Sequence, residues 1–288
     1  METLLQASTQ GILIGAVYAA IALGFSVVYS VSGVVNFAHG DFLVLGMYVV
    51  LSIAIATGID PYLTAPVVVV VMGLLGALVW QFLIKRVARS KLILVAQLTL
   101  GISFVIQSLL LIVFGPNEQR VRSVLTGSTL EIGFLNIEWT KLVAFAVAAA
   151  LSVLFFVMAK RTDFGRAIRA IHQNQTAAVL VGLRVSRIQL ATFALGIAIV
   201  GLGASVMVPI SDFNPSMGFS FTIIVFIAVA LGGMDDYIGV LIGGLIVGVA
   251  ESIGGVYLPG NYGEFLPFVA LLAILLFRPA GILKGRNA

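Results

Sequence analysis

The sequence contains no cysteine and only two histidines, His39 and His172. The lack of cysteine excludes disulfides, thiol catalysis and metal sites that need a Cys ligand. The two histidines lie in different loops, and neither Ser-His-Asp nor His-x-x-x-His spacing occurs. The sequence therefore predicts no catalytic site and no metal site.

Charge is also scarce, because charged residues make up 10% of the chain and hydrophobic residues 60%. A soluble domain carries about 25% charged residues, and a soluble chain this apolar would have little with which to cover its surface. A bilayer core roughly 30 Å thick is crossed by about 20 apolar residues. The sequence thus predicts an all-α integral membrane protein, with residues 1–288 forming one transmembrane domain of about eight or nine helices, some of them broken or re-entrant.

A phosphate-binding Gly-x-x-x-x-Gly-Lys-Ser/Thr loop is missing as well, so any ATP is expected to be bound and hydrolysed by other subunits, and no cofactor is expected here. The net charge of +4 does not indicate nucleic-acid binding, because Lys and Arg gather in a few short loops. The first residues, Met1 to Thr3, lack the basic region of a cleavable signal peptide, so the first apolar segment is expected to remain as a crossing.

Nine apolar segments follow one another along the chain. The two shortest, 219–233 and 265–277, are the candidates for a re-entrant segment. The first is 10–30, and the second follows a break at 32–41 and ends at 57. The other seven are 62–83, 92–114, 139–159, 188–210, 219–233, 237–256 and 265–277.

Three basic stretches set the predicted orientation. They are 85–91, 160–187 and the tail with Arg278, Lys284 and Arg286. The positive-inside rule places all three in the cytoplasm, which nine crossings allow, since an even number of crossings separates each pair. The N-terminus is then expected outside and the C-terminus inside.

Several glycines have the small-xxx-small spacing that lets helix backbones approach closely. This spacing predicts a compact bundle. The pairs are Gly11 with Gly15, Gly239 with Gly243, and Gly244 with Gly248.

The break before the second segment carries polar residues. Asn36 is a candidate N-cap, His39 follows, and Asp41 falls in the first turns of the next helix, where a negative charge suits the helix dipole. Transporters use discontinuous helices of this kind to present backbone groups to a solute. An ordinary cytoplasmic turn is the alternative.

Other polar residues lie inside apolar segments. Thr99, Ser103 and Gln107 have four-residue spacing and share a helix face, which either lines a path or bonds helices together. Glu251 either faces a path or packed helix, or reaches water at the outer interface. The candidate path residues are Asn36, His39, Asp41, Thr99, Ser103, Gln107 and Glu251.

The loop from Thr162 to Arg187 is too long for a simple hairpin. Its apolar positions and the stop signal at Gly182 predict one or two short helices at the membrane surface. Such helices either anchor to lipid head groups or dock a partner protein.

Two motifs resemble a known family. Gly15–Phe25 followed by Asn36-Phe37-Ala38-His39-Gly40-Asp41, and Leu231-Gly232-Gly233-Met234 followed by spaced glycines and Glu251, are similar to branched-chain amino acid ABC transporter permeases of the high-affinity leucine/isoleucine/valine uptake type. The resemblance covers nearly the whole chain. The family commonly has Gly-Ser where this chain has Asp235-Asp236, and the role of these two acidic residues is open.

The resemblance implies a permease subunit of an ATP-binding cassette importer in the bacterial inner membrane, which moves branched-chain or related small amino acids by alternating access driven by partner ATPases. It further implies a second related permease, two cytoplasmic ATPase subunits and a periplasmic solute-binding protein. The loop at about 160–187 would couple to the ATPase through Gly165, Arg166, Arg169, Asn174, Ala177, Ala178 and Gly182. Urea or short amides are alternative solutes, and a stand-alone transporter or channel and a scaffold without transport are alternative classes.

Overall fold

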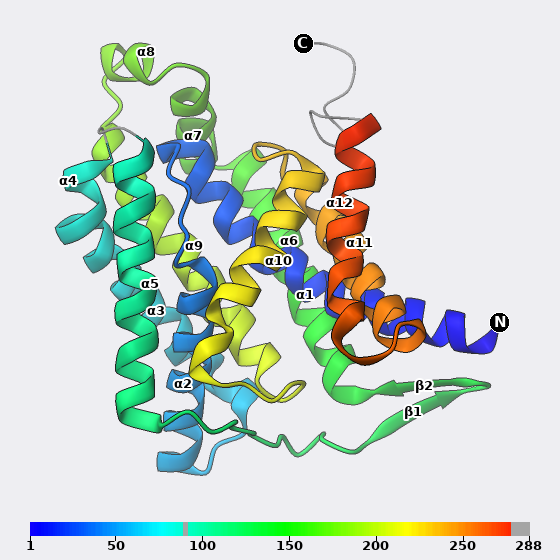
Figure 1. The fold of residues 1–288 in the computed structure, drawn as a ribbon. Coiled ribbons are helices and arrows are strands. Elements are labelled where there is room, and N and C mark those ends of the chain that lie inside the picture. The colour runs from blue at the N-terminus through cyan, green and yellow to red at the C-terminus, as the bar shows by residue number, and fades with distance from the viewer. Residues whose placement is uncertain (89–91, 278–288) are drawn as a thin grey trace.

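The computed structural model describes residues 1–88 and 92–277, so Arg89, Lys91, Arg278, Lys284 and Arg286 of the predicted basic stretches lie outside the described residues. The described chain is helical apart from one hairpin (Figure 1). Its elements are α1 (Glu2–Ser32), α2 (His39–Thr57), η1 (Pro61–Thr64), α3 (Ala65–Val79), η2 (Trp80–Ile84), α4 (Lys85–Val87), α5 (Leu92–Phe114), β1 (Thr129–Ile132), β2 (Leu135–Glu138), α6 (Trp139–Arg161), α7 (Asp163–Gln173), α8 (Gln175–Leu180), α9 (Val185–Met207), η3 (Pro215–Met217), α10 (Gly218–Gly232), α11 (Tyr237–Tyr257), η4 (Gly260–Phe265) and α12 (Leu266–Phe277).

Eight helical segments in the described residues are long and apolar enough to cross a membrane. They correspond to the first eight predicted segments, and the all-α polytopic fold is confirmed. The ninth, α12, has 12 described residues, about 18 Å of helix, which is shorter than a bilayer core.

The first helix begins at Glu2, earlier than the predicted residue 10. Its polar residues Gln6 and Gln10 bond to the hairpin: both Nε2 groups donate to the Asn136 carbonyl, at 2.6 and 2.9 Å, and Gln6 Oε1 accepts from the Asn136 N–H. With 31 residues the helix is about 46 Å long. A helix that exceeds the bilayer core tilts, and α1 runs obliquely through the bundle (Figure 1).

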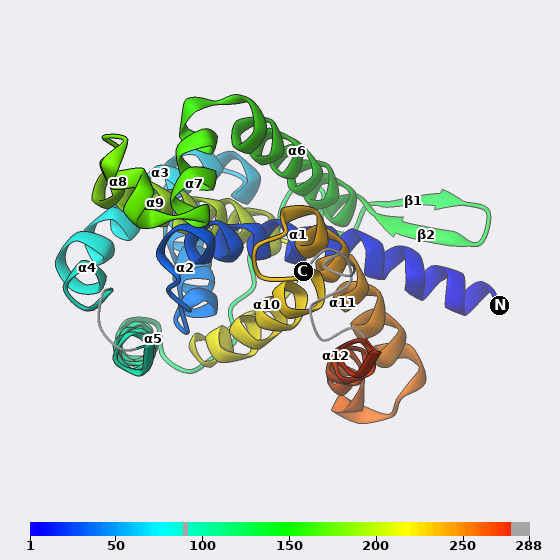
Figure 2. The ribbon, with the colours of Figure 1, turned by 90° about the horizontal axis from the view of Figure 1, so that it is seen from above.

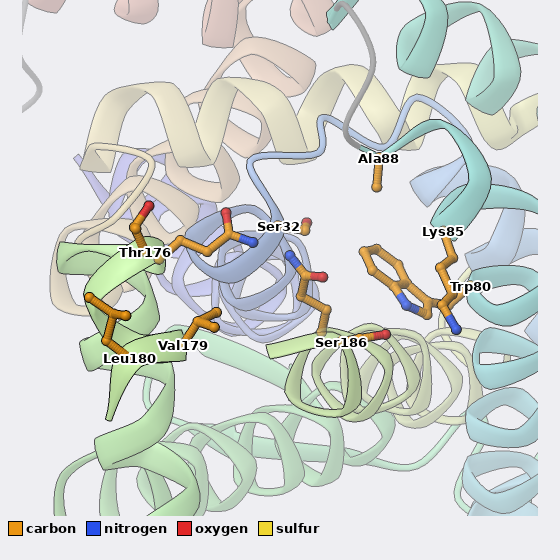
Figure 3. Close-up of a pocket in the computed structure, with 10 residues that line it drawn as sticks. Ser32, Trp80, Lys85, Ala88, Thr176, Val179, Leu180 and Ser186 are labelled. Carbon is orange, nitrogen blue, oxygen red and sulfur yellow. The ribbon is translucent and has the colours of Figure 1, made fainter. Parts of the chain in front are cut away.

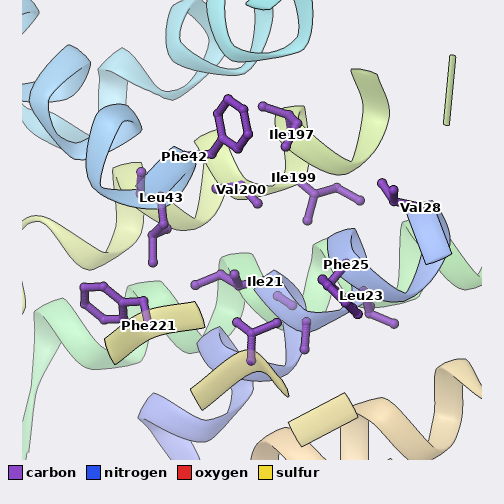
Figure 4. Close-up of a cluster of buried hydrophobic side chains, with 14 of the residues drawn as sticks. Ile21, Leu23, Phe25, Val28, Phe42, Leu43, Ile197, Ile199, Val200 and Phe221 are labelled. Atoms are coloured by element: carbon purple, nitrogen blue, oxygen red, sulfur yellow. The ribbon is translucent and has the colours of Figure 1, made fainter. Parts of the chain in front are cut away.

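The core surrounds α1, whose residues from Gly15 to Val28 are all buried. Apolar side chains of α1, α2, α9 and α10 meet there, among them Phe25, Phe42, Val200 and Phe221 (Figure 4). Seen from above, α5 lies at the edge of the bundle, and the hairpin projects beside the N-terminal end of α1 (Figure 2).

Close glycine packing joins α1 to α11. A Cβ added at Gly11 would lie 2.6 Å from Val249 Cα, and one at Gly15 would lie 2.9 Å from the Gly244 carbonyl oxygen. Gly244 and Gly248 face Ala19 and Gly15 in return, and Gly239 and Gly243 face Gly232 and Ala228 of α10. The predicted small-residue packing is confirmed for all three pairs.

The stretch between α5 and α6, which the apolar segments leave unassigned, contains the antiparallel hairpin β1–β2, with Thr129 opposite Glu138 and Ile132 opposite Leu135. Gly133 begins its two-residue turn with a φ of 63°, which a tight hairpin favours. Nearby, Asp60 accepts hydrogen bonds from the Ser123 hydroxyl and the Val124 N–H, at 2.7 and 2.9 Å. These contacts hold the loop before β1 against the start of η1. We call the ends of the bundle next to β1 and β2 the hairpin face.

The opposite ends form what we call the basic face, with Lys85 and Arg86 of α4 and the α7–α8 loop (Figure 1). Helices α3 and α6 both end on this face, as the predicted even number of crossings between the two basic stretches requires.

Candidate translocation site and docking loop

The chain between α1 and α2 is a buried break in the helical bundle. Helix α1 ends at Gly33, whose φ of 63° is left-handed, and residues 34–38 then run into the bundle, where Val34, Asn36 and Ala38 are buried. The predicted N-cap role of Asn36 is wrong by two residues, since Ala38 holds that position. Instead Asn36 Oδ1 accepts from the Ala38 N–H at 3.1 Å, an Asx turn that leads into the helix.

Hydroxyl groups from neighbouring helices bond to the backbone that the break exposes. The Phe37 N–H donates to Thr99 Oγ1 of α5 at 3.3 Å, and the Gly40 N–H donates to Thr222 Oγ1 of α10 at 2.8 Å. Inside a membrane, non-helical backbone is tolerated only where such groups are satisfied by protein or by a water-lined cavity. The break is therefore a built feature of the bundle, held by α5 and α10.

His39 and Asp41 point to opposite sides of the first turn of α2. His39 is buried, with Nε2 3.2 Å from the Ile21 carbonyl oxygen, and its ring meets Phe25 edge-on at 5.5 Å. Asp41 is 3% exposed and its carboxylate interacts with Ser103. Its Oδ2 atom has no hydrogen-bond partner among the described residues.

The predicted polar face of α5 lies only partly against this turn. Thr99 and Ser103 are buried, whereas Gln107 is half-buried. Thr99 also donates to the Ala96 carbonyl at 3.0 Å, so its hydroxyl serves both its own helix and the break.

Glu251 does not belong to this cluster. Its neighbour Ser252 bonds to the Ala7 carbonyl, whereas His39 bonds to the Ile21 carbonyl. These two carbonyls are about 21 Å apart along α1. The structure thus joins Asn36, His39, Asp41, Thr99 and Ser103 around one turn, and adds Thr222, which the sequence analysis missed because a single Thr in an apolar helix gives no signal.

The loop at 160–187 forms two short capped helices, as predicted. Thr162 Oγ1 accepts from the Gly165 N–H at 3.1 Å and begins α7, and Asn174 Oδ1 accepts from the Ala177 N–H at 2.9 Å and begins α8. Gly182 follows α8 with a φ of 86°, the left-handed conformation typical of helix ends.

Helix α7 is held against α6 and α1. A Cβ at Gly165 would collide with the Ala159 carbonyl, and the Arg169 guanidinium donates to that same carbonyl. His172 Nδ1 lies 3.0 Å from the Ser30 carbonyl oxygen, and its Nε2 lies 3.9 Å from Asp235 Oδ2. Arg166 pairs with Asp163 on the exposed side.

The two acidic residues of the α10–α11 turn have separate roles. Asp236 caps α11, since its Oδ1 accepts from the Ile238 and Gly239 N–H groups at 3.0 and 3.2 Å. Asp235 faces His172 of α7. The Asp-Asp pair therefore both begins a helix and contacts the loop.

Helix α8 projects from the basic face. Ala178 is its buried residue, whereas Leu180 and Val181 are 83% and 76% exposed. Beside α8 is a cavity of about 820 Å³, open between α8, α9, α4 and the end of α1 (Figure 3). Its lining includes Trp80, Lys85, Gln175, Thr176, Ser186 and Gln189.

Eight apolar helices in the described residues, with a buried break between the first two, define a multi-pass membrane protein. A family profile described as "Branched-chain amino acid transport system / permease component" matches residues 8–275. The chain belongs to this family, and the resemblance seen in its motifs is confirmed.

Curated relatives support the same assignment. The chain is 29% identical to the high-affinity branched-chain amino acid transport system permease protein LivH of Salmonella typhimurium, over 97% of this chain and 95% of LivH. It is 27% identical to BraD of Pseudomonas aeruginosa, over 97% and 95%, and 26% identical to LivM of Salmonella typhimurium, over 93% and 68%. No solved structure matches the chain.

Proposed function

We propose that this chain is the permease subunit of an ATP-binding cassette importer in the bacterial inner membrane, and that it moves branched-chain or related small amino acids by alternating access. The observation that carries the proposal is the apolar, capped helix α8, which stands out of the basic face. An exposed apolar surface of this kind is typical of a protein–protein contact. The printed names of the relatives supply the solute class.

The proposed partners follow from the same features. The α7–α8 loop, with Gly165, Arg166, Arg169, Asn174, Ala177, Ala178 and Gly182, would dock one of two cytoplasmic ATPase subunits, which bind the ATP. The chain is similar to both LivH and LivM, which supports pairing with a second, related permease chain. A periplasmic solute-binding protein would deliver the solute to the hairpin face.

Closure of the ATPases would move the docking loop. Because α7 contacts the end of α6 at Ala159, the end of α1 at Ser30 and the α10–α11 turn at Asp235, its displacement would reach four crossing helices. Helices α1 and α10 flank the break at Asn36–Asp41. The proposed coupling therefore runs from α8 to α7, from α7 to α1 and α10, and from these two helices to the break at Asn36–Asp41.

The proposed orientation places the basic face in the cytoplasm and the N-terminus in the periplasm. A chain without cysteine allows a direct test with single-cysteine variants. In intact cells, Val124→Cys in the hairpin-face loop should react with a membrane-impermeant maleimide, whereas Leu180→Cys should react only after lysis. The reverse labelling pattern would contradict the orientation.

Transport itself can be tested in proteoliposomes that contain this chain with its partner permease, ATPase subunits and binding protein. We expect ATP-dependent uptake of labelled leucine, and none when the ATPase subunits are left out. Uptake of urea or a short amide in place of leucine would favour the alternative solutes. Full uptake by the chain alone would establish a stand-alone transporter and refute the proposal.

A further inference from the structure

Two sets of three helices are arranged in opposite directions across the bundle. Successive crossing helices alternate in direction. Helices α1, α2 and α3 run toward, away from and toward the basic face, and α9, α10 and α11 run in the reverse order, away, toward and away (Figure 1). Helices α1 and α9 meet reciprocally: a Cβ at Gly24 would lie 2.7 Å from the Gly196 carbonyl oxygen, and one at Gly196 would lie 2.6 Å from that of Gly24. In each set the first helix is separated from the second by a break.

The two breaks share a local structure. Asn36 Oδ1 accepts from the Ala38 N–H at 3.1 Å, and Asn214 Oδ1 accepts from the Ser216 N–H at 3.0 Å. Gly40 and Gly218 each follow the Asn by four residues. A Cβ at Gly40 would collide with the Gly218 carbonyl, and one at Gly218 with the Asp41 carboxylate. The first turns of α2 and α10 therefore cross in contact, as in an inverted repeat with its broken helices at the centre.

Asp41 is the charged residue at this crossing. One carboxylate oxygen, Oδ1, lies against Gly218 at the beginning of α10, and Asp41 itself stands in the first turn of α2. Helix N-termini carry partial positive charge, which offsets part of the cost of burying a carboxylate at this position. Its second oxygen, Oδ2, is buried without a hydrogen-bond partner, and no Lys or Arg among residues 1–88 and 92–277 forms an ion pair with it.

We propose that Asp41 binds the cationic group of the solute, the α-ammonium of an amino acid, as the solute passes the crossing of α2 and α10. Oδ1 lies against Gly218, and Oδ2 accepts from the ammonium, while the carboxylate also interacts with Ser103. This inference rests on the proposed transport function. A neutral amide would give Oδ2 a hydrogen bond but no opposite charge, so Asp41 would favour amino acids over amides.

The first test compares variants in the complete proteoliposome system. Asp41→Asn should lower leucine uptake by at least about tenfold, because removal of one partner of a buried charge pair is costly. Stimulation of the ATPase by loaded binding protein should stay within about twofold of wild type. Asp41→Glu should restore part of the uptake. The matched control is Ser52→Ala, which removes an exposed hydroxyl of the same helix, one that bonds to the Tyr48 carbonyl, and should transport normally.

Wild-type uptake and KM in Asp41→Asn would overturn the inference. So would equal loss of uptake and ATPase stimulation in both Asp41→Asn and Asp41→Glu, which indicates a structural role. If proteoliposomes with the wild-type chain take up no amino acid, the proposed transport function is refuted, and this outcome is distinct from a failure of the Asp41 inference.

A second measurement does not depend on Asp41→Asn being active. Ser103→Cys is made in the cysteine-free chain and treated during ATP turnover with 2-aminoethyl methanethiosulfonate or its anionic 2-sulfonatoethyl analogue. The cationic reagent should react about tenfold faster, since an adjacent carboxylate attracts it. In the double variant Ser103→Cys with Asp41→Asn, the two reagents should react at the same rate. Equal rates in the single variant Ser103→Cys, or no reaction with either reagent, would overturn the inference.

Discussion

Replacing Leu180 with glutamate is expected to abolish the coupling of this chain to its ATPase. The side chain is 83% exposed at the end of α8, so the substitution leaves the fold intact. In the proposed complex it would place a carboxylate in an apolar contact, where an unpaired buried charge costs about 3–5 kcal/mol. ATPase stimulation by loaded binding protein should fall at least about tenfold, measured as phosphate release in proteoliposomes.

The matched control is Leu180→Met, which alters the same exposed side chain but keeps it apolar. This variant should keep wild-type stimulation. Normal stimulation in Leu180→Glu would show that α8 does not dock the ATPase, and the lipid-anchor interpretation of the loop would then be favoured.

Replacing Gly40 with valine is expected to prevent the bundle from assembling. Any side chain at this position meets the Gly218 carbonyl and Thr222 of α10, and neither backbone can move aside because both belong to first turns fixed by hydrogen bonds. Overpacking of this kind costs about 1–3 kcal/mol and more where backbone is opposed. The variant should give little monodisperse protein in size-exclusion chromatography and a lower Tm in detergent.

Gly101→Val provides the comparison, since Gly101 also lies within a crossing helix, α5, but faces open space among the described residues. Its yield and Tm should stay close to wild type. Equal behaviour of the two valine variants would contradict the close crossing of α2 and α10.

The sequence predicts the helices well because apolar runs long enough to cross a bilayer are separated by Gly, Pro and charge. Segment 92–114 matches α5 at both ends. The first helix is longer than predicted because Gln6 and Gln10 are satisfied by a distant backbone group, that of Asn136. Hydropathy carries no information about such a partner.

The candidate site is predicted less completely. The break was located from Asn36 and Asp41, and the structure brings both to one turn. The partner helix was not predicted, because contact between Gly40 and Gly218 links residues far apart in sequence. The hairpin was also missed, although Gly133 before Phe134 between short alternating segments is a usable turn signal.

The glycine contacts of α1 have a mechanical consequence. Helices whose backbones touch at Gly11, Gly15 and Gly24 pack without intervening side chains, so we expect α1, α9 and α11 to move together. Helix α5 instead meets the break before α2 through a side chain, Thr99, whose hydroxyl accepts from the Phe37 N–H. We therefore expect the hinge of any opening motion to separate α5 from α1, α9 and α11, with the Thr99 hydroxyl releasing the Phe37 N–H as the gap widens.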